Sequence, residues 1–167
     1  MNLKKIWKKF EILFFIVIFI LIDLITKSIF IKTRFCNDCM IYIRGMYNFG
    51  TSVGTIFGPH TSTILFYLTF IFIIMMLIYR NFFINNKYLK WCYILIISGA
   101  SANAIDRYLI GAVRDFIGIA TGSANLFIFN IADVYVFLAL FCYAIFYFDH
   151  FEIHHKHGIK KRSNKTK

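Results

Sequence analysis

The sequence predicts a mainly α-helical integral membrane protein with four transmembrane helices and a small extracytoplasmic β-rich segment between the first two. Three observations predict this fold class. Hydrophobic residues make up 59% of the 167 residues and include 21 Phe, more apolar side chain than a soluble domain of this length can bury. Long apolar runs recur along the chain, and most basic residues lie between them. This distribution favours basic cytoplasmic loops over a nucleic-acid-binding surface, despite a net charge of +11.

The first predicted span covers residues 10–31 and follows a lysine-rich start. It is long enough to cross the ~30 Å hydrocarbon layer. It also lacks the small-residue cleavage site of a signal peptide, so we expect it to be retained. Asp23 and Lys27 lie four residues apart on one face and can neutralise each other. Two interpretations are equally good: a charge pair near the membrane boundary, or an inward-facing support for a polar site.

The character of the chain changes over residues 32–63, where glycines punctuate partly alternating apolar and polar residues. Short β-strands resting on the membrane surface suit this pattern. Asn48 followed by Gly50 is a turn-like pair that could contact an extended peptide or simply form a hairpin. Cys36 and Cys39 form a single C-x-x-C without a second half, which favours a disulfide or two free thiols over a metal site.

The next two spans are predicted at residues 64–79 and 91–109, on either side of a basic loop at residues 80–90. The third span turns polar in its second half. Its polar stripe consists of Gly99, Asn103, Asp106 and Arg107, which share one helical face. Such a stripe should face the protein interior or a watery cleft.

A connection of about twenty residues leads to the fourth span, at residues 129–148, and a basic tail covers residues 149–167 with several histidines. Residues 1–167 are therefore expected to form a single membrane domain. The N-terminal segment, the loop at 80–90 and the C-terminal tail together hold 13 of the 19 lysines and arginines. By the positive-inside rule, both termini are predicted to be cytoplasmic. For the histidine-rich tail, a solvated basic segment near anionic lipid is favoured over metal chelation.

Three of only eight acidic residues lie between residues 99 and 133, where charges are expensive unless paired, hydrated or used. The predicted topology places Asp115 just after the third span and Asp133 one turn into the fourth. Both carboxylates should therefore meet at the outer rim of the membrane. Such a pair can share a proton, so that one member activates water while the other protonates a carbonyl oxygen. Alternatively, one of the two aspartates could cap a helix and the other could be the partner in a salt bridge. Asn130, three residues before Asp133, should orient its carboxylate.

Five motifs in order resemble those of the signal peptidase II family, the lipoprotein signal peptidases of bacterial inner membranes. They are D-x-x-T-K at 23–27, N-x-G at 48–50, N-x-x-D-R at 103–107, V-x-D-F at 113–116 and F-N-x-A-D at 129–133. Each motif alone is weak, but the five in this order on such a scaffold are strong. The resemblance implies that Asp115 and Asp133 are the catalytic pair of an aspartic endopeptidase.

The resemblance also implies roles for other residues. Asn48 and Gly50 would contact the substrate or its surroundings, and further residues would shape the cleft: Asn103, Arg107, Asn130 and Ala132. Asp106 would be a structural partner of Arg107, and Asp23 with Lys27 would brace the site. The implied substrates are diacylglyceryl-modified prolipoproteins, cut before the lipidated cysteine. We expect a monomer in the inner membrane, in contact with lipid, with the site at the outer face and neither metal nor cofactor nor nucleic acid.

This chain departs from the family pattern at two places. Ala102 stands where the family usually has Gly, and Thr51, Ser52 and Val53 replace two alanines and an aromatic residue. These modest changes bear on substrate contact more than on chemistry. The residues leave two alternative functions. A Mg²⁺-dependent lipid phosphotransferase would use clustered aspartates, but Asp106 and Asp115 are poorly spaced for it. A proton-coupled transporter would use Asp23 and Asp106, but the chain lacks internal repeats.

Overall fold

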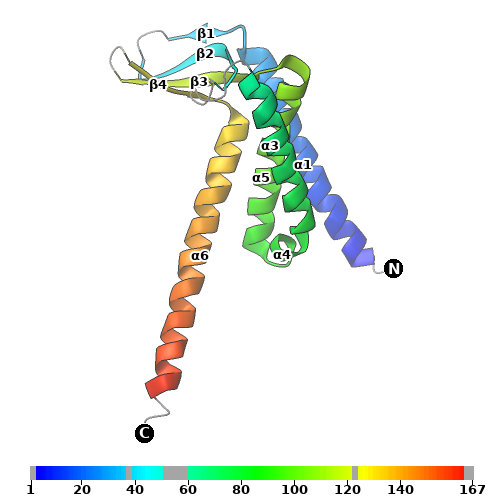
Figure 1. The fold of residues 1–167 in the computed structure, drawn as a ribbon, viewed down its shortest axis with the longest axis vertical. Coiled ribbons are helices and arrows are strands. Elements are labelled where there is room, and N and C mark those ends of the chain that lie inside the picture. The colour runs from blue at the N-terminus through cyan, green and yellow to red at the C-terminus, as the bar shows by residue number, and fades with distance from the viewer. Residues whose placement is uncertain (1–2, 37–38, 51–59, 122–123, 164–167) are drawn as a thin grey trace.

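The fold is a bundle of helices with a small antiparallel sheet lying across one end (Figure 1). The computed structural model describes residues 3–36, 39–50, 60–121 and 124–163, and side chains are described for Trp7 and within 10–36, 39–50, 60–120 and 127–147. The long helices are α1 (Leu3–Phe30), α3 (Thr61–Ile78), α5 (Lys87–Ile110) and α6 (Ile131–Ser163). A short helix, α4 (Arg80–Ile84), lies within the predicted basic loop. Both ends of the described chain lie away from the sheet (Figure 1).

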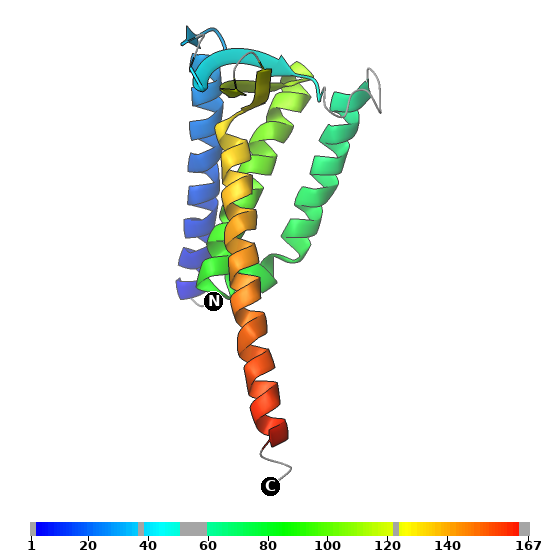
Figure 2. The same ribbon diagram turned by 90° about the vertical axis from the view of Figure 1, so that its left-hand side faces the viewer.

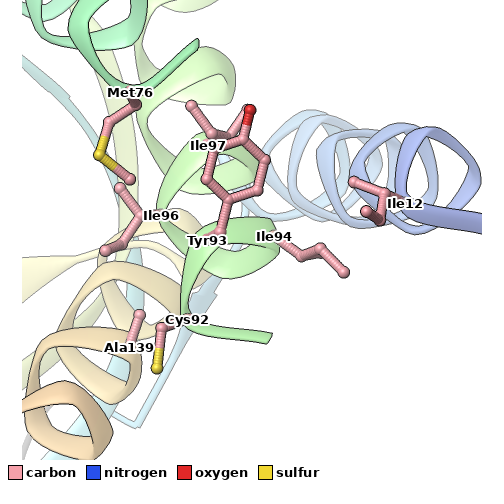
Figure 3. Close-up of a cluster of buried hydrophobic side chains, with 8 residues drawn as sticks. All are labelled: Ile12, Met76, Cys92, Tyr93, Ile94, Ile96, Ile97 and Ala139. Atoms are coloured by element: carbon pink, nitrogen blue, oxygen red, sulfur yellow. The ribbon is translucent and has the colours of Figure 1, made fainter. Parts of the chain in front are cut away.

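Helix α5 is the centre of the bundle and packs against α1, α3 and α6. Its start is capped by Asn86, whose side chain accepts from the backbone N–H groups of Tyr88 and Leu89. The buried apolar cluster gathers around it, as Figure 3 shows, and consists of Ile12, Met76, Cys92, Tyr93, Ile94, Ile96, Ile97 and Ala139. By contrast, the outward faces of α1, α3 and α6 carry many exposed large apolar side chains. That inside-out pattern is expected where lipid is the solvent.

Two described helical segments, Phe10–Phe30 and Thr61–Ile78, are long and apolar enough to cross a membrane. Ile131–Tyr147 in α6 is a shorter apolar segment. The polar half of α5 lowers its apolar character, because Asn103, Asp106 and Arg107 lie there. The predicted first, second and third spans nevertheless each coincide with a long helix. The predicted fourth span starts two residues early, because Phe129 ends a strand and α6 begins at Ile131.

The sheet contains four antiparallel strands in the order β1, β2, β3, β4. Strands β1 (Arg34–Phe35) and β2 (Ile41–Asn48) come from the predicted β-rich segment. Strands β3 (Val113–Thr121) and β4 (Ala124–Phe129) come from the connection between the third and fourth predicted spans. The prediction of a β-rich segment between the first two spans alone was therefore incomplete. Half of the sheet is a second hairpin whose β2–β3 pairing joins the two segments.

Three further predictions concern the cysteine pair, the C-terminal tail and the residues that follow Gly50. Cys36 and Cys39 form a disulfide, with Cα atoms 5.6 Å apart, which decides between the alternatives left open by the sequence. The backbone at 149–163 continues α6 as a helix instead of forming a separate tail. The side chains of its histidines lie outside the described residues, as do Thr51, Ser52 and Val53.

Candidate active site

Asp115 and Asp133 are brought to the same end of the bundle by two different kinds of element. Helix α5 ends at Gly111, whose backbone is left-handed (φ 78°) and whose N–H donates to the Arg107 carbonyl. The chain then turns directly into β3, where Asp115 is the third residue and is only 2% exposed. Asp133 lies in the first turn of α6, which leaves the sheet after β4. Both acids therefore lie at the sheet end of the bundle, whereas their place at the membrane rim stays a prediction.

The N-terminus of α6 fixes the orientation of Asp133. The Asp133 N–H donates to Asn130 Oδ1 (3.0 Å), and the Asn130 N–H donates back to Asp133 Oδ2 (3.1 Å). This reciprocal arrangement is a capping box. A carboxylate in the first turn of a helix is also favoured by the helix dipole. Helix geometry therefore holds Asp133 without any neighbouring cation being needed.

Amide side chains connect the two carboxylates. Asn130 Nδ2 donates to Asp115 Oδ1 (2.6 Å), whereas the remaining Asp133 oxygen, Oδ1, accepts from Asn103 Nδ2 (2.8 Å). The sequence prediction that the Asn130 amide orients Asp133 is thus corrected in detail. Asn130 holds Asp133 by its backbone N–H and directs its amide nitrogen to Asp115, because its side-chain oxygen is used in the cap.

The β2–β3 pairing delivers a further amide to Asp115. Met46 lies opposite Asp115 in the ladder, so Asn48, two residues further along β2, is its diagonal neighbour on the same face. Asn48 Nδ2 donates to Asp115 Oδ2 (2.8 Å). Its Oδ1 accepts from the Gly50 N–H (2.8 Å), and Gly50 has φ +80°, a conformation that favours glycine. The N-x-G motif therefore forms an Asx-turn that presents the amide to Asp115.

A second cluster of charges lies behind this pair and is made of ion pairs. Lys27 Nζ contacts Asp23 Oδ2 (2.6 Å) and Asp106 Oδ2 (3.4 Å), and all three side chains are fully buried. Arg114 Nη2 contacts Asp106 Oδ1 (2.7 Å), and the Arg114 backbone N–H donates to the same carboxylate (3.1 Å). Every acid in this cluster therefore has a cation within contact.

The partner of Asp106 differs from the one that the family resemblance implies. Its ion pairs are with Lys27 and Arg114, while Arg107 Nη1 donates to the Asn103 carbonyl at 3.5 Å. The reason is geometric, because consecutive residues on a helix point in different directions. Sequence reasoning missed Arg114, since its partner lies eight residues earlier across the Gly111 turn. The V-x-D-F motif leaves its position unspecified, so no signal pointed to it.

The ion-pair cluster supports the carboxylate pair through two contacts. Lys27 Nζ donates to Asn103 Oδ1 (2.8 Å), and Asn103 in turn donates to Asp133. Asp23 Oδ1 accepts from the Ala132 N–H (2.8 Å). Of the two interpretations of the Asp23–Lys27 pair, these contacts select the inward-facing support.

Small residues allow this close packing of α5 against α6. A Cβ atom added at Gly99 would lie 2.5 Å from the Ala132 carbonyl oxygen, and Ala132 itself is fully buried. The two backbones therefore approach closely one turn before Asn103, as small residues permit in membrane helices. Gly99 and Ala132 together set the spacing at which Asn103 reaches Asp133.

The electrostatics of the two carboxylates differ from those of the ion-pair cluster. Burial raises the pKa of Asp115 to about 6, the N–H groups of Asn48 and Asn130 oppose the rise, and the charge of Asp133 adds to it. Each of the four carboxylate oxygens accepts one N–H, either from a side-chain amide or from the backbone. A buried acid with a pKa near neutrality beside a second acid is the arrangement expected for proton transfer at ordinary pH.

An open pocket of about 450 Å³ exposes one side of this pair between α3 and α6. Figure 2 shows α3 standing apart from α6, with α5 behind them. The polar part of the lining is Thr69, Asn103, Arg107 and Asp133, and the apolar part includes Val136, Phe137 and Leu140. Asp133 is thus accessible from the pocket while Asp115 lies behind it. Within the described residues, no group of three or more His, Cys, Asp or Glu side chains could hold a metal ion.

The fold and this site combine a helix bundle that has apolar outer faces with two acids held by neutral amides at the sheet end. Two solved structures are similar to the chain, and both are described as bacterial membrane enzymes studied by the in meso method. One has a TM-score of 0.68 and 27% identity, covering 83% of this chain and 88% of the other. The second has a TM-score of 0.68 and 28% identity, covering 81% and 90%.

Sequence comparison identifies the family. The family model for signal peptidase (SPase) II matches residues 15–149. The lipoprotein signal peptidase of Clostridium tetani is 35% identical over 137 residues, covering 78% of this chain and 88% of that protein. The lipoprotein signal peptidase of Buchnera aphidicola is 31% identical over 160 residues, covering 89% and 98%. The chain belongs to the signal peptidase II family and is a membrane aspartic peptidase of that type.

Proposed function

We propose that the chain removes signal peptides from diacylglyceryl-modified prolipoproteins, cutting before the lipidated cysteine, with Asp115 and Asp133 as the catalytic pair. The observation that carries this proposal is the shared Asn130, which donates to one oxygen of each carboxylate. No cation pairs with either acid within the described part of the chain. The pair is thus positioned by neutral donors and keeps its capacity to exchange a proton.

The proposed chemistry assigns different roles to the two acids. Asp133 faces the pocket and, as a carboxylate, takes a proton from a water molecule that attacks the scissile carbonyl carbon. Asp115, whose pKa is raised to about 6, carries the shared proton and gives it to the carbonyl oxygen. The resulting gem-diol returns a proton to Asp115 as the carbonyl re-forms. The C–N bond breaks in the same step, and the leaving amine takes the proton held by Asp133.

Substrate would reach the acids through the pocket between α3 and α6. Its apolar wall of Val136, Phe137 and Leu140 suits an apolar signal peptide, and Arg107 at its polar end suits peptide carbonyl groups. Asn48 covers Asp115 Oδ2 and would give up this bond when the scissile carbonyl arrives. Gly50 supports Asn48 through the Asx-turn, and Ala132 lets α5 and α6 approach.

We further propose that residues 1–167 form a single domain with four transmembrane spans in the bacterial inner membrane. The exposed apolar faces of α1, α3 and α6 support this assignment, as does the sheet at the end opposite to both termini (Figure 1). The charge distribution supports cytoplasmic termini, an orientation that would put the acids near the outer face. The protein would act as a monomer surrounded by lipid.

The test uses purified full-length protein in detergent with a diacylglyceryl-modified prolipoprotein. Wild type, Asp115→Asn and Asp133→Asn are compared on a gel that resolves the signal-peptide shift, with and without chelator. We expect wild type to cleave in the presence of chelator and both variants to lose cleavage by about a thousandfold. Asp38→Asn, outside the carboxylate pair, is the matched control and should cleave normally. Cleavage that survives both substitutions would refute the catalytic pair.

A further inference from the structure

A second pocket, far from the carboxylates, lies at the end of the bundle opposite to the sheet. It has a volume of about 260 Å³ and is bounded by α1, by the α3–α4 junction and by α5. Its lining residues are Ile12, Leu13, Ile16, Leu77, Arg80 and Tyr93. Five of the six are apolar or aromatic, and the sixth is a single cation.

Arg80 is half-buried at the mouth of this groove and has no carboxylate partner within the described residues. Glu11, at the same end of the bundle, is already paired with Lys90 at 2.8 Å. An arginine with unused donors at the edge of an apolar groove is complementary to a group with a fixed negative charge on an apolar tail. The position of Arg80, just after α3 ends at Ile78, is where the apolar span meets the interface.

The floor of the groove adds a polar atom near this cation. Tyr93 is almost fully buried, and Figure 3 shows its ring on the side of α5 away from Ala139. The groove walls include Leu13, which is 57% exposed and so lines an opening toward the surroundings of the bundle. An acyl chain could enter there, between α1 and α3, and lie on the Tyr93 ring.

We propose that this groove binds one anionic phospholipid of the cytoplasmic leaflet, with its phosphate on Arg80 and an acyl chain along Ile12, Leu13 and Ile16. The leaflet follows from the proposed topology, whereas the binding itself does not depend on peptidase activity. A larger pocket between α5 and α6, of about 520 Å³, has no charged residue in its lining. That pocket offers an internal comparison, because it should accept acyl chains without distinguishing head groups.

Native mass spectrometry of the full-length protein in detergent tests the proposal. Phosphatidylglycerol and phosphatidylcholine with identical acyl chains are titrated, and the first binding constant of each is read. We expect wild type to prefer phosphatidylglycerol by about fivefold, since one interfacial cation contributes on the order of 1 kcal/mol. Arg80→Gln should remove this preference. Lys87→Gln, an exposed basic residue at the same end, should keep it.

A second pair of variants tests the groove separately from the charge. Leu13→Trp should fill the groove and weaken both lipids. Ile145→Trp, similarly exposed but in the larger pocket, should leave the phosphatidylglycerol preference unchanged. Equal binding of the two lipids to wild type would overturn the proposal. The proposal would also be overturned if Arg80→Gln and Lys87→Gln lost the phosphatidylglycerol preference to the same extent. The same holds if Leu13→Trp and Ile145→Trp weakened lipid binding to the same extent. None of these readouts involves cleavage, so they stand or fall apart from the proposed peptidase function.

Discussion

Two groups of acids lie side by side in this molecule, and their carboxylates are held by different kinds of donor. Asp23 and Asp106 are fully buried, and each contacts a cation: Lys27 contacts both, and Arg114 adds a bidentate contact to Asp106. Asp115 and Asp133 receive only amide and backbone N–H donors. The first group is neutral as a whole, whereas the second keeps its negative charge uncompensated by direct contact.

The contrast separates a carboxylate pair held by neutral donors from acids held by ion pairs. Neutral N–H donors favour the carboxylate form less strongly than an ion pair does, and burial still raises the pKa of Asp115 despite them. The ion-pair cluster holds the position of Asn103 and of the α6 N-terminus, so it supplies rigidity without contributing a proton. Positioning is thereby carried by Asp23 and Asp106, which are distinct from the two acids proposed to transfer a proton.

The largest effect is expected when the ion-pair cluster is broken. Lys27→Met leaves the fully buried Asp23 without a cation and Asp106 with Arg114 alone, so it should destabilise the protein by about 3–5 kcal/mol. Thermal unfolding in detergent measures this. Lys90→Met is the matched control, because its partner Glu11 is 41% exposed and such pairs contribute about 1 kcal/mol or less. Equal losses in the two variants would contradict the division between the acid groups.

Removing a charge from the carboxylate pair is expected to change stability in the opposite direction. A raised pKa in the folded state means that Asp115 contributes full stability below its ordinary pKa of 3.8, and that this stability is lost as the pH rises through about 6. Asp115→Asn removes this loss, so at pH 8 the variant should be more stable than wild type by up to about 3 kcal/mol. At pH 4 the difference should largely vanish.

Melting temperatures at the two pH values test this prediction, and Asp106→Asn provides the comparison. That substitution leaves Lys27 and Arg114 with one acid fewer, so it should destabilise the protein at pH 8. A lower melting temperature for Asp115→Asn than for wild type at pH 8 would mean that the amide donors compensate its charge fully.

A smaller effect is expected when the bidentate contact of Arg114 with Asp106 is lost. Arg114→Lys keeps the charge beside Asp106 but loses the two-pronged contact and the Nη1 contact to Ser28. Because charge-assisted hydrogen bonds are lost, the free energy of unfolding should fall by about 1.5 kcal/mol. Because Arg114 directly precedes Asp115, the cleavage rate should fall as well, with KM unchanged. Arg44→Lys, an exposed arginine on β2, should change neither quantity.

The helices and the acids were predictable from the sequence because their signals are local. Apolar length predicts α1 and α3, and the spacing of Asn103 and Asp106 predicts a polar face on α5. The capping box that starts α6 was also present in the sequence, as Asn130 and Asp133 three residues apart. The predicted span nevertheless starts at Phe129, because the apolar residues of a strand and of a helix look alike in the sequence.

What escaped prediction depends on contacts between distant segments. The β3–β4 hairpin follows a helix end and pairs with β2 about 70 residues earlier, and no local periodicity encodes that pairing. The same is true of the Asn48–Asp115 hydrogen bond, which links residues 67 positions apart. Motif order could suggest that these residues share a site, but only the strand register shows which oxygen each amide reaches.

The smallest predicted effect tests whether the amide donors tune the proton of the reactive pair. If Asp115 must carry the shared proton, the cleavage rate falls as the pH rises above its pKa of about 6. The N–H of Asn48 stabilises the carboxylate form and holds that pKa down. Asn48→Ala should therefore raise the pKa of Asp115 in the free enzyme and move the falling limb of the pH profile of kcat/KM to higher pH.

The direction of this shift separates tuning from substrate contact. Loss of a purely substrate-binding amide would raise KM and leave the limb in place, whereas loss of a donor to Asp115 moves the limb whatever happens to KM. Ser28→Ala is the control, because its hydroxyl contacts Arg114 and belongs to the ion-pair cluster. A limb that stays fixed or moves to lower pH in Asn48→Ala would show that a group other than Asp115 carries the proton.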